Sequence, residues 1–184
     1  PNSAFAFTPL RVPCTLRSAQ TSEAHEINMA DESAALDLLY KAADKLLDAQ
    51  SKLTKDGVDE FAENASQFQA VLDNAKVGPK SKTLSLQILP KYMGRFPDLA
   101  DSALDILIDL FEENEQYHMK AIEGFKVVAT SAPAAVIGKL VGVLAQLLQS
   151  EDQKEVDAVN DALVAALEKD VTGTIGAVLE HMAS

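Results

Sequence analysis

A hydrophobic period of three to four residues runs almost unbroken from Met29 to the end of this chain and constrains its fold more than any other feature. Apolar residues at that spacing form the buried stripe of an amphipathic helix, and no segment alternates at period two for long enough to form a strand. Glycine, proline and asparagine interrupt the period and divide it into eight stripes. The expected helices lie around residues 36–53, 58–75, 84–92, 97–113, 119–125, 133–147, 153–167 and 171–182.

The stripes recur as pairs. Pro97 and Leu104 are repeated 36 residues later as Pro133 and Leu140, and Ile137 is repeated 38 residues later as Ile175. A repeat of this length, built from two helices, is typical of an α-solenoid of the HEAT or armadillo kind, in which each pair needs its neighbours to bury its inner faces. We therefore expect an all-α chain of antiparallel helix pairs, and an irregular helical bundle is the alternative.

Residues 1–28 differ from the rest, because they contain three prolines and many Ser and Thr residues without a sustained helical period. We expect them to be a disordered leader or an expression remnant, with an organelle transit peptide as the less favoured alternative. Residues 29–184 are then the helical repeat domain, and they carry the whole net charge of −12.

The charge and the composition narrow the classes of function. A net charge of −12 repels phosphate backbones, so direct nucleic-acid binding is disfavoured and a basic protein partner is favoured. No apolar stretch approaches the length that spans a bilayer, so we expect a soluble protein without a membrane segment. The single cysteine, Cys14, cannot form an internal disulfide, which fits a reducing intracellular compartment.

Five acidic residues fall on one face of the helix expected from Pro97. At about 100° per residue they lie within roughly 80° of each other, opposite the apolar stripe. Residues 98–115 contain no Lys or Arg to neutralise them. We take this acidic stripe as the candidate site for a basic protein, and a merely solvated face is the alternative. The acidic stripe consists of Asp98, Asp101, Asp105, Asp109 and Glu112.

Two further patterns are weaker candidates for binding. A basic island without any acidic residue could contact phosphate or an acidic partner, but pairing with neighbouring acidic helices or solvation of a loop is the favoured interpretation. The island consists of Lys76, Lys80, Lys82, Lys91 and Arg95. Leu144, Leu147 and Leu148 spell LxxLL, a docking motif for nuclear-receptor grooves. The hydrophobic core needs the same leucines, so we expect these three to be core residues.

No motif indicates catalysis, a metal or a cofactor. His25, His118 and His181 are far apart and none has a second His or Cys at ligand spacing. The glycines are scattered through expected helices and do not form a phosphate-binding loop. No serine or cysteine nucleophile lies in a recognisable turn. We therefore expect a protein that is not an enzyme and needs no cofactor.

The last expected helix has a broad apolar face. Ile175, Val178, Leu179 and Met182 lie on it, and terminal repeats of independent solenoids usually carry polar residues at such positions. We expect this C-terminal edge to be uncapped and to favour self-association.

The stretch LPKYMGRFPDLADSA at residues 89–103 resembles the apoptosis inhibitor 5 family, also called anti-apoptosis clone 11. The resemblance covers roughly residues 36–182 and continues through KAI at 120–122, LLQSED at 147–152, VNDAL at 159–163, GTIG at 173–176, LYK at 39–41 and FQAVLD at 68–73. Where the family tends to have a basic pair before Gln-Ala-Ile, this chain has His118 and Met119 before Lys120-Ala121-Ile122. Proteins of the family are also far longer.

The resemblance implies a HEAT-like fold and a nuclear, non-enzymatic adaptor that opposes programmed cell death through protein contacts. It implies fibroblast growth factor 2 and Acinus as partners, and nuclear or cytoplasmic localisation, because this chain contains no import signal. Two alternatives stay open. One is an RNA-processing or mRNA-export adaptor that contacts nucleic acid or helicases through the basic island, and the other is a structural fragment of a longer solenoid.

Overall fold

The structure is a computed structural model that describes the backbone of residues 14–183 and the side chains of residues 31–179. Over these residues the chain forms eight α-helices and two short 3₁₀ helices, with no strand. The elements are α1 (Cys14–Asp56), η1 (Ala62–Asn64), α2 (Ala65–Asn74), α3 (Pro79–Tyr92), η2 (Met93–Arg95), α4 (Pro97–Glu113), α5 (Glu115–Ser131), α6 (Ala134–Leu147), α7 (Gln153–Lys169) and α8 (Val171–Ala183).

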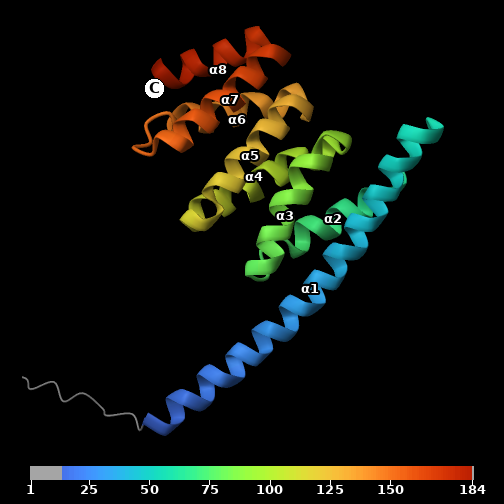
Figure 1. Cartoon of the computed structure of the whole chain (residues 1–184), viewed down its shortest axis with the longest axis vertical. Helices are drawn as coiled ribbons and strands as arrows, with labels where there is room; N and C mark the ends of the chain where they lie inside the picture. The colour runs from blue at the N-terminus through green and yellow to red at the C-terminus, as the bar shows by residue number, and fades with distance from the viewer. Residues whose placement is uncertain (1–13, 184) are drawn as a thin grey trace, which may run out of the picture.

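The helices stack as pairs in two layers (Figure 1). In one layer α1 packs on α3, α3 on α5 and α5 on α7; in the other α2 packs on α4, α4 on α6 and α6 on α8. Each helix also packs on its neighbour along the chain. The prediction of an all-α chain with eight helices in packed pairs is confirmed for residues 14–183. Its assignment to the HEAT or armadillo class stays an interpretation of this arrangement.

The N-terminal part of α1 projects beyond the stack, whereas its later part packs on α2 and α3 (Figure 1). Residues 1–13 of the expected leader lie outside the described residues, and residues 14–28 are the beginning of α1. The proposed domain boundary at residue 29 stays a prediction. Among residues 14–183, no helix is both long and apolar enough to cross a membrane.

The core is aliphatic, with a small aromatic cluster near the first two pairs. Phe68 of α2 stacks on Phe96 with 4.6 Å between ring centroids, and Phe61 meets Phe96 edge to face at 5.8 Å. Because Phe96 lies directly before α4, these contacts hold the start of α4 against α2. Farther along the stack, the largest fully buried side chains are Leu104, Leu107, Leu110, Ile122, Phe125, Ile137 and Leu140.

Proline and capping residues begin most helices where the sequence places them. Pro79 and Pro97 occupy the first positions of α3 and α4, where the missing N–H costs no hydrogen bond. Glu32 of α1 accepts a hydrogen bond from the backbone N–H of Lys80 at 2.7 Å and so anchors α1 to the start of α3. Oδ1 of Asn114 accepts a hydrogen bond from the backbone N–H of Gln116 and so caps α5.

Ser150 and Gln153 look like a capping box for the seventh helix, but that prediction is wrong. The capping residue is Asp152, whose Oδ1 accepts from the N–H of Lys154 at 2.8 Å. The hydroxyl of Ser150 instead accepts from the N–H of Asp152 and donates to Oε2 of Glu155. Ser150 therefore shapes the turn before α7, and Asp152 satisfies the helix end.

A glycine sets the distance between α3 and α5. A Cβ atom at Gly124 of α5 would lie 2.9 Å from Cγ of Pro90 on α3, a separation that real Cβ atoms essentially never show. Gly138 in α6 offers the opposite case, because nothing lies within 4 Å of the position a Cβ would take. The two glycines thus occupy similar helices with very different surroundings.

We predict opposite effects for substitutions at these two glycines. Gly124→Val should lower the free energy of unfolding by about 1–3 kcal/mol, because the added carbons force α3 and α5 apart. Gly138→Ala should raise it by about 0.5–1 kcal/mol, because alanine has the higher helix propensity and meets no obstacle. Urea unfolding followed by circular dichroism measures both changes. Equal tolerance of the two substitutions would contradict the close approach at Pro90.

Candidate protein-binding surface

The acidic stripe occupies the exposed side of α4. All five of its carboxylate side chains are exposed, and the opposite side of the helix carries the buried residues Ala103, Leu104 and Leu107. This orientation follows from the helical period, since the apolar side must face α2, α5 and α6. The carboxylates are therefore free to meet other groups at the protein surface.

Two lysines from outside α4 neutralise part of the stripe. Nζ of Lys139 on α6 lies 2.9 Å from Oδ1 of Asp101 and 2.5 Å from Oδ1 of Asp105. Lys76, which follows α2, forms an ion pair with Asp109. The hydrogen bonds to Asp105 and then Asp101 raise the pKa of Lys139 above its ordinary value of 10.5, so this amine is charged at neutral pH.

The stripe stays anionic despite these pairs. Among residues 31–179, the ion pairs reach Asp101, Asp105 and Asp109 but not Asp98 or Glu112. Five carboxylates therefore meet two amines. The sequence of residues 98–115, which lacks Lys and Arg, correctly indicates where the negative charge lies. It does not reveal the lysines that pair with it, which are Lys139 of α6 and Lys76 after α2.

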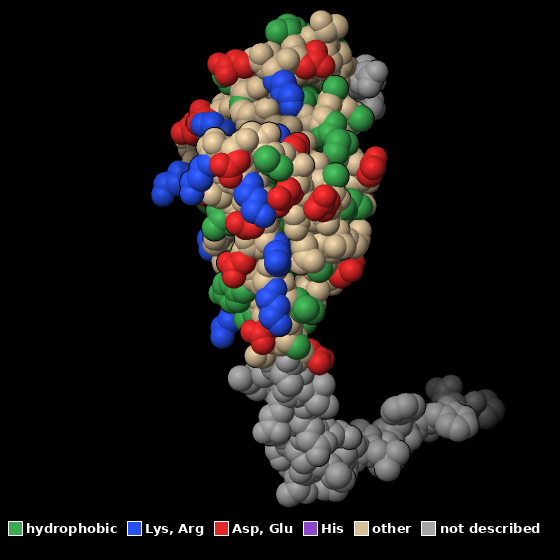
Figure 2. Space-filling model, turned by 90° about the vertical axis from the view of Figure 1, so that its right-hand side faces the viewer, with side chains coloured by type: hydrophobic (Ala, Val, Ile, Leu, Met, Phe, Trp, Pro, Cys, Tyr) green, Lys and Arg blue, Asp and Glu red, His purple; other side chains and the backbone are tan. Residues whose placement is uncertain are grey.

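The ion pairs that join different repeats have a regular spacing in the sequence. Each joins opposite charges about one repeat apart: Lys82 and Glu113 are separated by 31 residues, Lys76 and Asp109 by 33, Lys126 and Asp161 by 35, and Lys139 and Asp101 by 38. On the face shown in Figure 2, basic and acidic side chains lie interleaved along the long axis of the molecule. A search for opposite charges at the repeat spacing would have found these partners.

The basic island does not form one patch. Lys76 and Lys82 pair with the acidic residues Asp109 and Glu113 of α4. The guanidinium of Arg95 lies over the ring of Phe61 at 5.4 Å from its centroid. Lys80 and Lys91 take part in no ion pair of the described residues, and Lys91 lies 5.0 Å from the ring centroid of its neighbour Tyr92. The structure thus divides the island between two surfaces.

The LxxLL leucines do not share an exposed face. Leu144 is fully buried and Leu147 is half-buried, whereas Leu148 is 40% exposed. Helix α6 also ends at Leu147, so Leu148 lies in the turn that follows. A receptor groove would need all three leucines at once, and Leu144 is held in the core.

His118 joins three helices. Its ring, on α5, stacks on Phe111 of α4 with 4.3 Å between centroids, and its Nδ1 lies 2.9 Å from Oε1 of Glu155 on α7. Glu155 is also bonded to Ser150. Within the part of the chain that the structure describes, no three His, Cys, Asp or Glu residues gather closely enough to hold a metal ion.

The C-terminal edge exposes apolar side chains on α8. Ile175 is 47% and Leu179 is 58% exposed, and both line a hollow of about 220 Å³ with Leu163 and Leu167 of α7. The hydroxyl of Thr174 is buried at the same place and finds no hydrogen-bond partner among the described residues. Met182, which the sequence also assigns to this face, lies outside the described side chains.

Comparisons with known proteins show a family model and several relatives that match this chain. The family model of apoptosis inhibitory protein 5 matches residues 36–184. The chain is 34% identical over 127 residues to apoptosis inhibitor 5-B of Xenopus laevis, covering 69% of this chain and 24% of that relative. It is 32% identical over 128 residues to apoptosis inhibitor 5 of Homo sapiens, covering 69% of this chain and 24% of that relative.

A plant relative extends the match. The apoptosis inhibitor 5-like protein of Oryza sativa subsp. japonica is 29% identical over 155 residues, covering 83% of this chain and 27% of that protein. The chain thus spans about a quarter of the length of the curated relatives it matches. Because the family model covers residues 36–184, which include every helix from α2 to α8, the chain belongs to the apoptosis inhibitory protein 5 family.

Proposed function

We propose that this chain is a non-enzymatic scaffold for protein–protein interactions that takes part in suppressing programmed cell death. Membership of the apoptosis inhibitory protein 5 family supports the role, as do the names of the relatives. The two-layered stack of helices supports the mode of action, because it presents a long rigid surface on which a partner can lie. On this proposal the protein acts in the nucleus or the cytoplasm through its partners.

The binding site is the acidic stripe of α4, and the partner is a basic protein. The observation that carries this proposal is the imbalance of charge, because among residues 31–179 the five exposed carboxylates pair with only two amines, those of Lys76 and Lys139. A basic partner would supply the missing positive charges and would be attracted from a distance. Fibroblast growth factor 2 and Acinus-type proteins are the partners to test first.

An adaptor that contacts nucleic acid through the basic island is less well supported. Lys76 and Lys82 already pair with carboxylates of α4, and Arg95 lies over Phe61. A phosphate backbone would have to displace the carboxylates that already pair with Lys76 and Lys82. The net charge of −12 also opposes binding of this kind.

We predict that the triple change Asp101→Asn, Asp105→Asn and Asp109→Asn weakens binding of fibroblast growth factor 2 by at least about tenfold. The fluorescence anisotropy of the labelled growth factor measures this loss. Binding by the unchanged chain should also fall between about 50 and about 300 mM NaCl, because salt screens exposed charges. Stability should change by less than about 1 kcal/mol, since exposed ion pairs contribute little.

A matched control variant distinguishes an effect of the acidic stripe on binding from an effect of net charge. Glu63→Gln, Glu151→Gln and Glu168→Gln remove three exposed carboxylates elsewhere, and none of them takes part in an ion pair of the described residues. This control should bind like the unchanged chain. An equal loss of affinity in both variants would attribute the binding to net charge and would exclude the stripe as the site.

We predict the opposite result for Lys139→Met. This change removes the amine that pairs with Asp101 and Asp105, so both carboxylates become available to the partner. Affinity for the basic partner should rise several-fold at low salt, while the free energy of unfolding falls by less than about 1 kcal/mol. Isothermal titration calorimetry measures the first change and urea unfolding the second. Weaker binding by this variant would contradict the proposal.

The C-terminal edge supports a second contact, which is self-association. Light scattering over a concentration series should show oligomers of the unchanged chain, and Leu179→Glu should abolish them, because a charge replaces an exposed apolar group of the hollow. Leu47→Glu changes an exposed leucine on α1 and should have no effect. A strictly monomeric unchanged chain at high concentration would refute this contact.

A further inference from the structure

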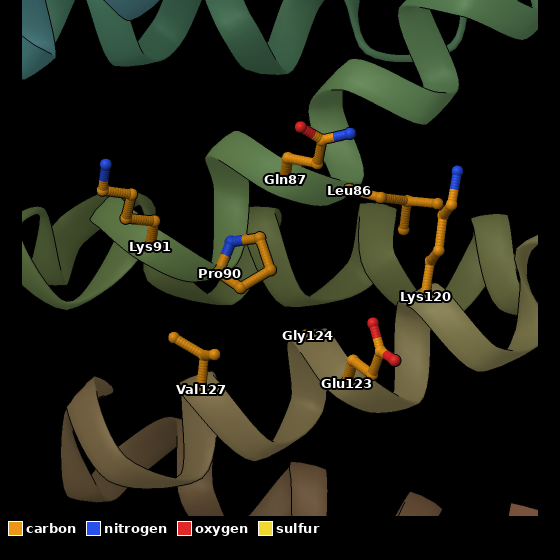
Figure 3. A pocket seen from close by; sticks show the side chains of 8 residues that line it. All are labelled: Leu86, Gln87, Pro90, Lys91, Lys120, Glu123, Gly124 and Val127. Atoms are coloured by element: carbon orange, nitrogen blue, oxygen red, sulfur yellow. The ribbon is translucent and has the colours of Figure 1, made fainter.

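A hollow of about 490 Å³ lies between α3 and α5, on the layer of odd-numbered helices (Figure 3). Pro90 and Gly124 lie next to each other where the two helices meet, and Lys91 of α3 and Lys120 of α5 lie toward opposite ends of the hollow (Figure 3). The acidic stripe lies on α4, in the other layer. The hollow is therefore a separate surface from the proposed site for a basic protein.

The hollow exists because two side chains are small or compact at the point where the helices meet. Gly124 has no side chain, and a Cβ there would lie 2.9 Å from Cγ of Pro90. The two helices consequently approach closely at this point, while no larger side chain fills the space above it. Val127, 43% exposed, adds an apolar wall to the hollow.

The surface continues across α3 to α1. A second hollow, of about 540 Å³, lies between α1 and α3 and shares Gln87 with the first. Tyr40 of α1, 58% exposed, and Lys80 of α3 line it. Apolar and aromatic groups thus alternate with lysine amines along the layer.

The lysines of this surface form no ion pairs with the described residues. Lys80, Lys91 and Lys120 take part in no ion pair of the described residues, whereas Lys76, Lys82, Lys126 and Lys139 are all paired. Glu123 is the single acidic residue among those that line the two hollows. In a chain with a net charge of −12, a local excess of free amines beside apolar groups is complementary to an acidic partner.

We propose that the hollow between α3 and α5 binds an acidic, amphipathic segment of a partner protein. An apolar side chain of the segment enters the space above Pro90 and Gly124, and carboxylates on either side of it pair with Lys91 and Lys120. The segment can extend over α3 toward Lys80 and Tyr40. The chain then holds two partners of opposite charge on its two layers.

The same surface is poorly suited to nucleic acid. The affinity of a phosphate backbone grows with the number of amines that displace its counterions, and this surface offers three, with Glu123 among them. Single-stranded chains also need several aromatic platforms for their bases, and Tyr40 is the single aromatic residue that lines the two hollows. Nucleic acid is therefore an alternative that the experiment must exclude.

Fluorescence anisotropy with three labelled probes tests the proposal on the full chain. The first probe is a twelve-residue peptide with one leucine between Glu-rich arms, the second replaces that leucine with serine, and the third is a twelve-nucleotide oligouridine. The leucine peptide should bind at least about tenfold more tightly than either other probe, because it alone offers both an apolar side chain and carboxylates. Equal binding of the serine peptide, or tighter binding of oligouridine, would overturn the proposal.

Two charge variants locate the binding. The double change Lys91→Glu and Lys120→Glu should weaken binding of the leucine peptide by at least about tenfold. Lys55→Glu with Lys154→Glu changes net charge equally at two exposed lysines outside the hollows and should leave binding almost unchanged. Equal losses in both variants would refute the site, as would failure of the unchanged chain to bind the peptide at millimolar concentration.

A third variant keeps this proposal separate from the acidic stripe. The triple change Asp101→Asn, Asp105→Asn and Asp109→Asn leaves the hollow intact, so it should bind the leucine peptide as tightly as the unchanged chain or more tightly. The circular dichroism spectrum of every variant should match that of the unchanged chain. A loss of peptide binding in this folded variant would show that the two surfaces are one site and would contradict the proposal.

Discussion

The contact between helices two apart along the chain is the constraint on which this structure depends. An amphipathic pair cannot bury its apolar faces alone, so α5 must pack on α7 and α6 on α8, as the earlier pairs do. The buried side chains of these helices, among them Ile122, Phe125 and Leu140, supply the hydrophobic stabilisation. Among residues 31–179 the charged side chains are thereby kept out of the core, where the buried polar side chains are Ser81, Ser85 and Thr174.

The stripe on α4 and the hollow between α3 and α5 differ in charge. On α4 the carboxylates outnumber the amines that Lys76 and Lys139 bring to them, so that side stays acidic. Between α3 and α5 the free amines of Lys91 and Lys120 lie beside apolar groups. Since surface ion pairs contribute little to stability, the arrangement of charge on these layers can follow the needs of binding more than those of folding.

The hydrophobic period predicted the order of the helices well, because each apolar stripe must face a neighbouring helix, although Pro90, Gly124 and Gly138 lie inside helices and mark no boundary. Capping chemistry led to the wrong choice of Ser150 over Asp152 at α7, since both side chains offer an oxygen near the same helix end. The hydrophobic period also predicted that the acidic stripe is exposed, but not that Lys139 reaches it, because that contact depends on the register between successive pairs.

The prediction of a basic island rested on proximity in sequence, which does not fix where side chains point. Lys82 and Lys91 both lie on α3, but Lys82 pairs with Glu113 of α4, whereas Lys91 lines the hollow between α3 and α5.

Hydrogen exchange of the full chain with a Lys-rich peptide tests the central claim that basic partners bind one layer alone. The amides of residues 97–113 should become protected in proportion to the bound fraction, and those of α3 and α5 around Pro90 and Gly124 should not change. Protection that spreads evenly over both layers, or that appears between α3 and α5 while α4 stays unchanged, would contradict the account.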